Sequence, residues 1–119
     1  MAIPVTATGQ ARSFELDQLL CGSVGQISLT GLTSISAWFF VDGPPLDPAS
    51  NFGETVYTDK LSPGQNFLFS SVIGQWFQVS TPVSGLNMST SMYELGVGAV
   101  VNGTADWTGT VYVDDIAIQ

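Results

Sequence analysis

Hydrophobic and polar residues alternate along this chain with a period of two, which is typical of β-strands. The clearest case is residues 34–42, where one face of an extended chain would carry Ile35, Ala37, Phe39 and Val41. Trp38 falls on the opposite face, together with Phe40. If the apolar set packs inward, these two rings point out of the sheet or into a concave groove.

Further segments alternate in the same way or are rich in β-branched residues. They predict strands at residues 12–20, 24–29, 55–58, 66–72, 76–83, 92–101 and 109–118, with a short edge strand at 5–8. Proline-rich residues 42–48 and the turns near residues 62–64 and 73–75 separate them, and no stretch of ten or more residues has helical spacing. The chain is therefore expected to be all-β, an antiparallel two-sheet β-sandwich of jelly-roll type, in a single domain over residues 1–119.

The alternation breaks near the end of the chain. Val111 and Val113 share a face, and strict alternation would put Asp115 on that face in place of Ile116. A β-bulge at the pair Asp114–Asp115 would restore the register. Bulges often aim a side chain at a site, so this pair is a candidate for chemistry.

The balance of charged residues limits the partners. Ten acidic residues stand against only Lys60 and Arg12, which gives a formal net charge of −8 among 119 residues. Two cations cannot neutralise a nucleic-acid backbone or dock on an anionic membrane. No run approaches the roughly 20 consecutive apolar residues of a membrane-spanning helix. We expect no nucleic-acid partner and no membrane partner.

Catalytic side chains are scarce. The chain has no His and only one Cys, Cys21, so the common nucleophile–base pairs and His-based metal sites are missing. A glycosidase needs two carboxylates about 5–9.5 Å apart, and Glu15, Glu54 and Glu94 lie in no recognisable motif. We expect a protein that is not an enzyme, with a small glycoside hydrolase as an alternative.

Three segments of the chain carry a family resemblance. They are residues 29–42 (LTGLTSISAWFFVD), 74–83 (GQWFQVSTPV) and 107–118 (WTGTVYVDDIAI). In order and spacing they resemble strands of the β-sandwich carbohydrate-binding modules of plant-polysaccharide-degrading enzymes, and residues 9–16 resemble an earlier strand of that family. The terminal Val-Tyr-Val-Asp-Asp-Ile is the most specific of these motifs.

The resemblance implies a jelly roll that binds a glycan and is covalently linked to a glycoside hydrolase in a secreted bacterial enzyme. It also implies a structural Ca²⁺ under the terminal Asp, for which Asp114 is the expected metal ligand. One carboxylate with backbone carbonyls can hold such a hard cation, and the alternative is a solvated strand end. In this family the first strand usually carries a further acidic ligand of the Ca²⁺, whereas residues 1–10 of this chain contain no Asp or Glu.

Aromatic side chains are the most distinctive candidates for ligand binding in this chain, because the apolar face of a sugar can lie flat on the ring of Trp or Tyr. The candidate carbohydrate-binding residues are Trp38, Tyr57, Trp76, Gln78, Trp107 and Tyr112. Trp107 is expected at the surface, since it lies in a polar turn. Trp76 matches a family position that usually packs at the core edge, and Gln78 shares its strand face. For each ring, a place in the core is the alternative.

These features together predict a monomer that binds a neutral plant β-glucan, whether cellulosic, mixed-linkage or xyloglucan, by aromatic stacking in a groove. A protein of charge −8 would repel acidic polysaccharides. The alternative is a structural or adhesive jelly-roll domain that self-associates through an exposed apolar patch.

Overall fold

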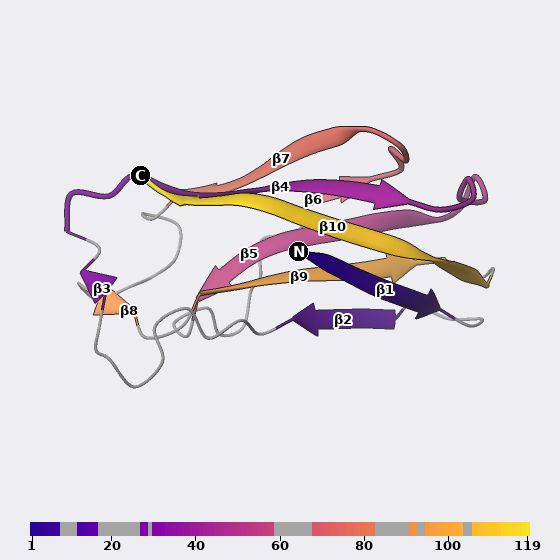
Figure 1. The fold of residues 1–119 in the computed structure, drawn as a ribbon, viewed down its shortest axis with the longest axis horizontal. Helices are drawn as coiled ribbons and strands as arrows, with labels where there is room; N and C mark the ends of the chain where they lie inside the picture. Colours follow the sequence, from indigo (N-terminus) through magenta and orange to yellow (C-terminus); the bar gives the residue numbers. More distant parts are fainter. Residues whose placement is uncertain are drawn as a thin grey trace.

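The structure, a computed structural model, describes residues 1–7, 12–16, 27–28, 30–58, 68–82, 91–92, 95–103 and 106–119. The described residues form strands, turns and extended segments without a helix (Figure 1). None of these segments is therefore a helix long and apolar enough to cross a membrane.

The described residues form ten strands. In chain order they are β1 (Ala2–Ala7), β2 (Arg12–Leu16), β3 (Ile27–Ser28), β4 (Ser34–Asp42), β5 (Asn51–Thr58), β6 (Leu68–Ser70), β7 (Trp76–Pro82), β8 (Ser91–Met92), β9 (Leu95–Asn102) and β10 (Trp107–Ile118). The strand predicted at residues 34–42 is confirmed with the same bounds. β1 starts earlier than predicted and includes Pro4, which it tolerates because β1 is an edge strand and an edge residue can do without a second hydrogen-bonding partner.

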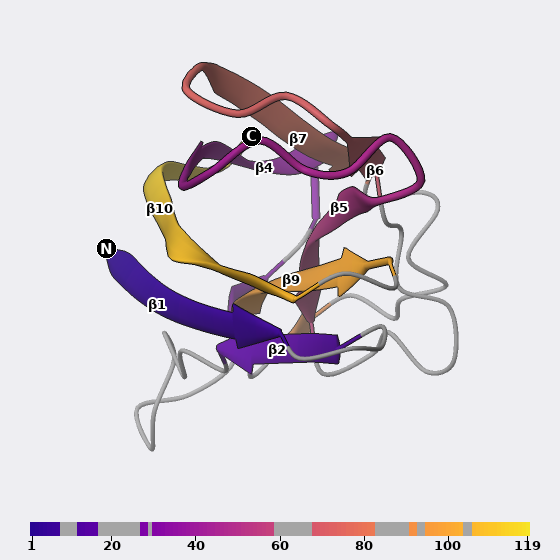
Figure 2. The ribbon, with the colours of Figure 1, turned by 90° about the vertical axis from the view of Figure 1, so that its right-hand side faces the viewer.

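The strands form two antiparallel four-stranded sheets. Sheet A has the order β1-β10-β4-β7, sheet B has the order β2-β9-β5-β6, and β3 pairs with β8 in a small third sheet. Chain-neighbouring strands such as β4 and β5, or β9 and β10, lie in different sheets, which is the connectivity of a jelly roll. Figure 2 looks roughly along the strands and shows sheet A curving from β7 through β4 and β10 to β1. The predicted all-β sandwich is confirmed.

Among the described side chains, the core lies between the two sheets and is built from residues of β1, β4, β5, β7, β9 and β10. Its buried members are Val5, Ala7, Ile35, Ala37, Phe39, Val41, Phe52, Val79, Val101, Trp107, Val111 and Val113. The apolar face predicted for residues 34–42 is thus confirmed, and each large apolar side chain buried there contributes about 1.5–3 kcal/mol. The opposite face of β4 is left to point away from the core.

A β-bulge interrupts the pairing of β10 with β4. Asp114 pairs with Trp38 and Ala117 with Ser36, so β10 has one residue more than β4 in this interval. Asp115 absorbs the extra residue with a φ of 47°. The bulge predicted at the Asp pair is therefore confirmed, and it returns the apolar end of β10 to the interior face.

Trp107 is buried, with only 4% of its surface exposed, so the expectation that it lies at the surface is wrong. β10 begins at Trp107 and not at residue 109, which puts the ring in the same inward alternation as Val111 and Val113. The indole packs edge-on against Phe52, with ring centroids 4.8 Å apart, and its N–H donates to the carbonyl oxygen of Pro44 at 2.9 Å. A side chain on Gly109 would overlap this ring.

Candidate functional site

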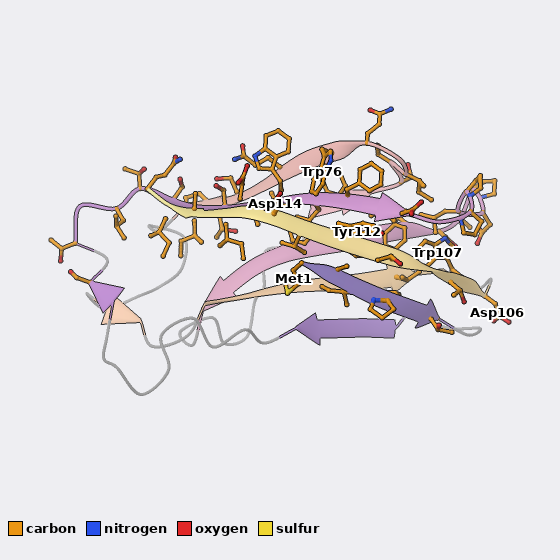
Figure 3. All side chains as sticks on the ribbon, in the orientation of Figure 1. Met1, Trp76, Asp106, Trp107, Tyr112 and Asp114 are labelled. Atoms are coloured by element: carbon orange, nitrogen blue, oxygen red, sulfur yellow. The ribbon has the colours of Figure 1, made fainter. Side chains whose placement is uncertain are left out.

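Three aromatic rings lie side by side across the outer face of sheet A. Tyr112 on β10 pairs with Phe40 on β4, and Phe40 pairs with Trp76 on β7. The ring centroid of Phe40 is 6.1 Å from that of Tyr112 and 5.4 Å from that of Trp76. We call these three residues the aromatic row. It runs perpendicular to the strands, because its members are direct cross-strand neighbours. Figure 3 labels Trp76 and Tyr112 at its two ends.

A second row of side chains lies next to the aromatic row. Trp38 on β4 has Asp114 of β10 on one side and Gln78 of β7 on the other. This row lies two positions along β4 from the aromatic row, a step of about 6.6 Å. Trp38 is 37% exposed and Trp76 is 48% exposed. Exposed apolar surface of this kind is a candidate binding surface.

Gln78 supplies an amide to this face. Its side chain is exposed, and its Nε2 donates to the Oγ of Ser36 at 3.4 Å. Gln carries an acceptor oxygen as well as two N–H donors. Within the described residues, the amide oxygen of Gln78 accepts no side-chain hydrogen bond.

Carboxylates stand beside the rings in two shallow hollows of the outer face. Trp38, Trp76, Asp114 and Asp115 line one hollow of about 380 Å³. Phe40, Asp42, Trp76 and Tyr112 line the other, of about 270 Å³. Trp76 is therefore the wall that the two hollows share, and each hollow combines aromatic surface with at least one exposed carboxylate.

The geometry around Asp114 provides few ligands for the predicted Ca²⁺. Asp114 Oδ1 already accepts the backbone N–H of Asp115 at 2.9 Å, and both carboxylates are exposed. In the described part of the chain, no three or more His, Cys, Asp or Glu side chains gather as a metal site. Ca²⁺ takes about six to eight oxygen ligands, so the described residues do not complete a calcium site, and the ion stays a prediction from the resemblance.

The structure brings together five of the residues predicted from the sequence. They are Trp38, Trp76, Gln78, Tyr112 and Asp114. Tyr57 is placed elsewhere, since its backbone pairs with Gly96 in sheet B, and its side chain lies outside the described residues. Trp107 is in the core.

Two residues of the face were missing from the candidate set. Phe40 completes the aromatic row, and Asp42 lines the smaller hollow. The sequence pattern could have identified both residues, because they fall on the same face as Trp38 in the alternation of residues 34–42.

The loop that follows β4 is fixed by Asp47. Its Oδ2 accepts from the Ser50 hydroxyl and its Oδ1 accepts from the backbone N–H of Ala49 at 2.8 Å. These two bonds hold the pKa of the Asp47 carboxyl below its ordinary value, and the bond from Ser50 has the larger effect. The same loop presents the Pro44 carbonyl to Trp107.

No protein-family model and no curated protein sequence matches this chain. Among solved structures, the chain is similar to a family 28 carbohydrate-binding module specific for non-crystalline cellulose, with 13% identity, a TM-score of 0.53, and coverage of 90% of this chain and 74% of that one.

Two further solved structures are similar at lower TM-scores. A family 61 module in complex with β-1,4-galactotriose has 16% identity, a TM-score of 0.41, and coverage of 93% of this chain and 69% of the other. SGBP-B from a xyloglucan utilization locus of Bacteroides uniformis has 18% identity, a TM-score of 0.46, and coverage of 98% and 44%. The similarity to the cellulose-specific module, with the two-sheet topology, shows that this chain has the β-sandwich fold of carbohydrate-binding modules.

Proposed function

We propose that the protein is a non-catalytic carbohydrate-binding module that holds a neutral β-glucan chain on the outer face of sheet A. The glucan is cellulosic, mixed-linkage or xyloglucan. The observation that supports this most strongly is the pair of exposed indoles, Trp38 and Trp76, next to the rings of Phe40 and Tyr112. A fold places such rings in water only at a cost, which a stacked ligand removes.

The arrangement of the rings sets the expected path of the glycan. Sugar units stack on the aromatic row, so the chain lies across the strands of sheet A, and one unit lies against Trp38. Hydroxyl groups donate to the carboxylates of Asp42 and Asp114 and to the amide oxygen of Gln78. Since the rings already pack on one another, little side-chain freedom is lost when the ligand binds.

The charge of the face supports a neutral ligand over an acidic one. Asp42, Asp114 and Asp115 are exposed there, and the protein as a whole has a formal charge of −8. A uronic acid would meet like charges, whereas hydroxyl groups meet acceptors. Bound in this way, the module would raise the local substrate concentration for a glycoside hydrolase to which it is linked in a secreted protein.

Affinity electrophoresis in gels that contain soluble polysaccharides tests this function. Hydroxyethyl cellulose, mixed-linkage β-glucan and xyloglucan represent the neutral class, and polygalacturonate represents the acidic class. We expect retardation by at least one neutral β-glucan and none by polygalacturonate. The Trp38→Ala variant should migrate as if no glycan were present. Unretarded migration of the unchanged protein in all three neutral gels would overturn the proposal.

Self-association through the same face is the second candidate, because exposed apolar patches also mark protein interfaces. Two copies paired face to face would bring Asp42, Asp114 and Asp115 of one copy toward those of the other, which disfavours this arrangement. Size-exclusion chromatography decides between the two. We expect a monomer, and an oligomer that the Trp76→Ala variant dissociates would support the second candidate.

A further inference from the structure

Of the two hollows on the outer face of sheet A, the one of about 380 Å³ contains an unusual set of groups for a strand surface. Its lining combines two indoles, Trp38 and Trp76, with two consecutive carboxylates, Asp114 and Asp115. Consecutive residues of a regular strand point to opposite faces of the sheet. The bulge changes this locally, since one extra residue is inserted between the pairs Asp114–Trp38 and Ala117–Ser36. It allows both carboxylates to line the same hollow.

The bulge gives one residue an uncommon backbone conformation. Asp115 is the one non-glycine residue of the described chain with a positive φ, at 47°. Non-glycine residues in this region cost free energy and gather at binding and active sites.

None of the described residues that line the hollow carries a positive charge. Asp114 accepts a neutral backbone N–H, and neither Lys nor Arg occurs among the described residues of sheet A. The Met1 ammonium donates to the carbonyl oxygen of Val113 at 2.7 Å and does not line the hollow. Arg12 is in β2 of sheet B.

Indole faces and carboxylates attract the same kind of ligand group. The negative face of an indole binds ammonium ions by cation–π interaction, and a carboxylate forms its strongest hydrogen bonds with a charged donor. A neutral hydroxyl group interacts more weakly than an ammonium group with both the indole face and the carboxylate. The net charge of −8 also attracts cations to the protein as a whole.

We propose that the hollow lined by Trp38, Trp76, Asp114 and Asp115 binds the protonated amino group of an amino sugar, so that a β-1,4-linked glucosamine chain is a ligand of this face in addition to a neutral glucan. This inference depends on the proposed function in one respect, namely that the outer face of sheet A binds glycans. The acidic hollow then adds a preference for glycans that carry amines.

Three oligosaccharides of equal length and equal β-1,4 linkage test the inference by isothermal titration calorimetry. They are the oligomers of glucosamine, of N-acetylglucosamine and of glucose, used at low salt and at a pH where the free amine is protonated. We expect the glucosamine oligomer to bind at least about tenfold more tightly than the other two. Its affinity should fall as salt is added.

Two variants with charge changes separate the hollow from the overall charge of the protein. Asp114→Asn with Asp115→Asn should weaken binding of the glucosamine oligomer about tenfold to a hundredfold, and Asn is compatible with the positive φ at position 115. Asp106→Asn removes a charge from an exposed residue at the distant end of the molecule (Figure 3) and should leave that affinity nearly unchanged. Equal losses in the two variants would overturn the inference.

The three ligands also separate the inference from the proposed function. Binding of the glucose oligomer with no preference for the amine would refute the amine site and leave the proposed function standing. Binding of the glucosamine oligomer alone would support the amine site and refute the neutral glucan as ligand. Equal affinity for the glucosamine and N-acetylglucosamine oligomers would also refute the amine site.

Discussion

Trp107 donates its indole N–H to the carbonyl oxygen of Pro44, at a distance of 2.9 Å and across 63 positions of the sequence. Through this bond the first residue of β10 fixes the loop that follows β4. The ring also packs edge-on against Phe52 of β5, so one side chain joins both sheets and a loop. Its role is therefore to hold the sandwich together at this end.

Replacement of Trp107 by Phe should lower the free energy of unfolding by about 1–3 kcal/mol, because the variant loses the hydrogen bond and part of the buried ring volume. Urea denaturation measures this change. The affinity of the folded variant for glycan should stay the same, since the residue is 4% exposed and lies in the core. A stable variant with lost binding would show that Trp107 contacts the ligand after all.

The bulge at Asp115 has a conformational requirement that can be measured. Its φ of 47° suits Asp, Asn or Gly and is unfavourable for a β-branched residue. The Asp115→Val variant should lose about 1–2 kcal/mol of stability, whereas Asp115→Asn should stay within about 0.5 kcal/mol of the original protein. If thermal unfolding gives equal stabilities for the two variants, the bulge does not have this backbone geometry.

Asp47 provides a prediction about pH. The pKa of its carboxyl is below the ordinary value of 3.8, because the Ser50 hydroxyl and then the Ala49 amide donate to it. A carboxyl whose pKa is lower in the folded state adds stability above the unfolded pKa and loses it as the pH falls through the folded value. This contribution is therefore fully present at neutral pH, begins to fall near pH 4, and is lost once the pH is below the folded pKa.

Nuclear magnetic resonance titration of the Asp47 side-chain carboxyl measures this shift. In the Ser50→Ala variant, the midpoint should move up toward the ordinary value, because the first of the two donors is lost. An identical midpoint in the original protein and the variant would show that the Ser50 hydroxyl does not stabilise the charged carboxylate.

The predicted binding of Ca²⁺ at Asp114 can be tested by removing the ion with a chelator. If this ion holds the end of β10, EDTA lowers the melting temperature by several degrees and added Ca²⁺ restores it, since a ligand that binds only the folded state stabilises that state. Ca²⁺ would then also compete with the glucosamine oligomer for the same carboxylates. A melting temperature that does not respond to EDTA removes the metal from the account.

The sequence predicts much of the fold, because one period-two pattern determines both the strands and their buried faces. The outward position of Trp38, and the bulge at the Asp pair, followed from where Val113, Ile116 and the apolar residues of 34–42 had to point. Trp107 was misplaced because the first residues of a strand carry too few neighbours to show alternation.

The neighbours of each ring depend on which strands pair and in what register, and periodicity within one strand does not determine this. From the sequence alone, Trp38, Gln78 and Asp114 are therefore separate candidates, and the topology β10-β4-β7 places them in one row. Tyr57 shows the converse, since its strand belongs to sheet B.

The affinity of Trp76 variants for a soluble β-glucan tests the central claim most directly, because Trp76 is the most exposed ring of the face and lines both hollows. By isothermal titration calorimetry, Trp76→Ala should bind at least about tenfold more weakly than the original protein, and Trp76→Phe, which keeps a ring, should lose less. Circular dichroism confirms that both variants are folded. Unchanged glucan affinity in the folded Trp76→Ala variant would contradict the account.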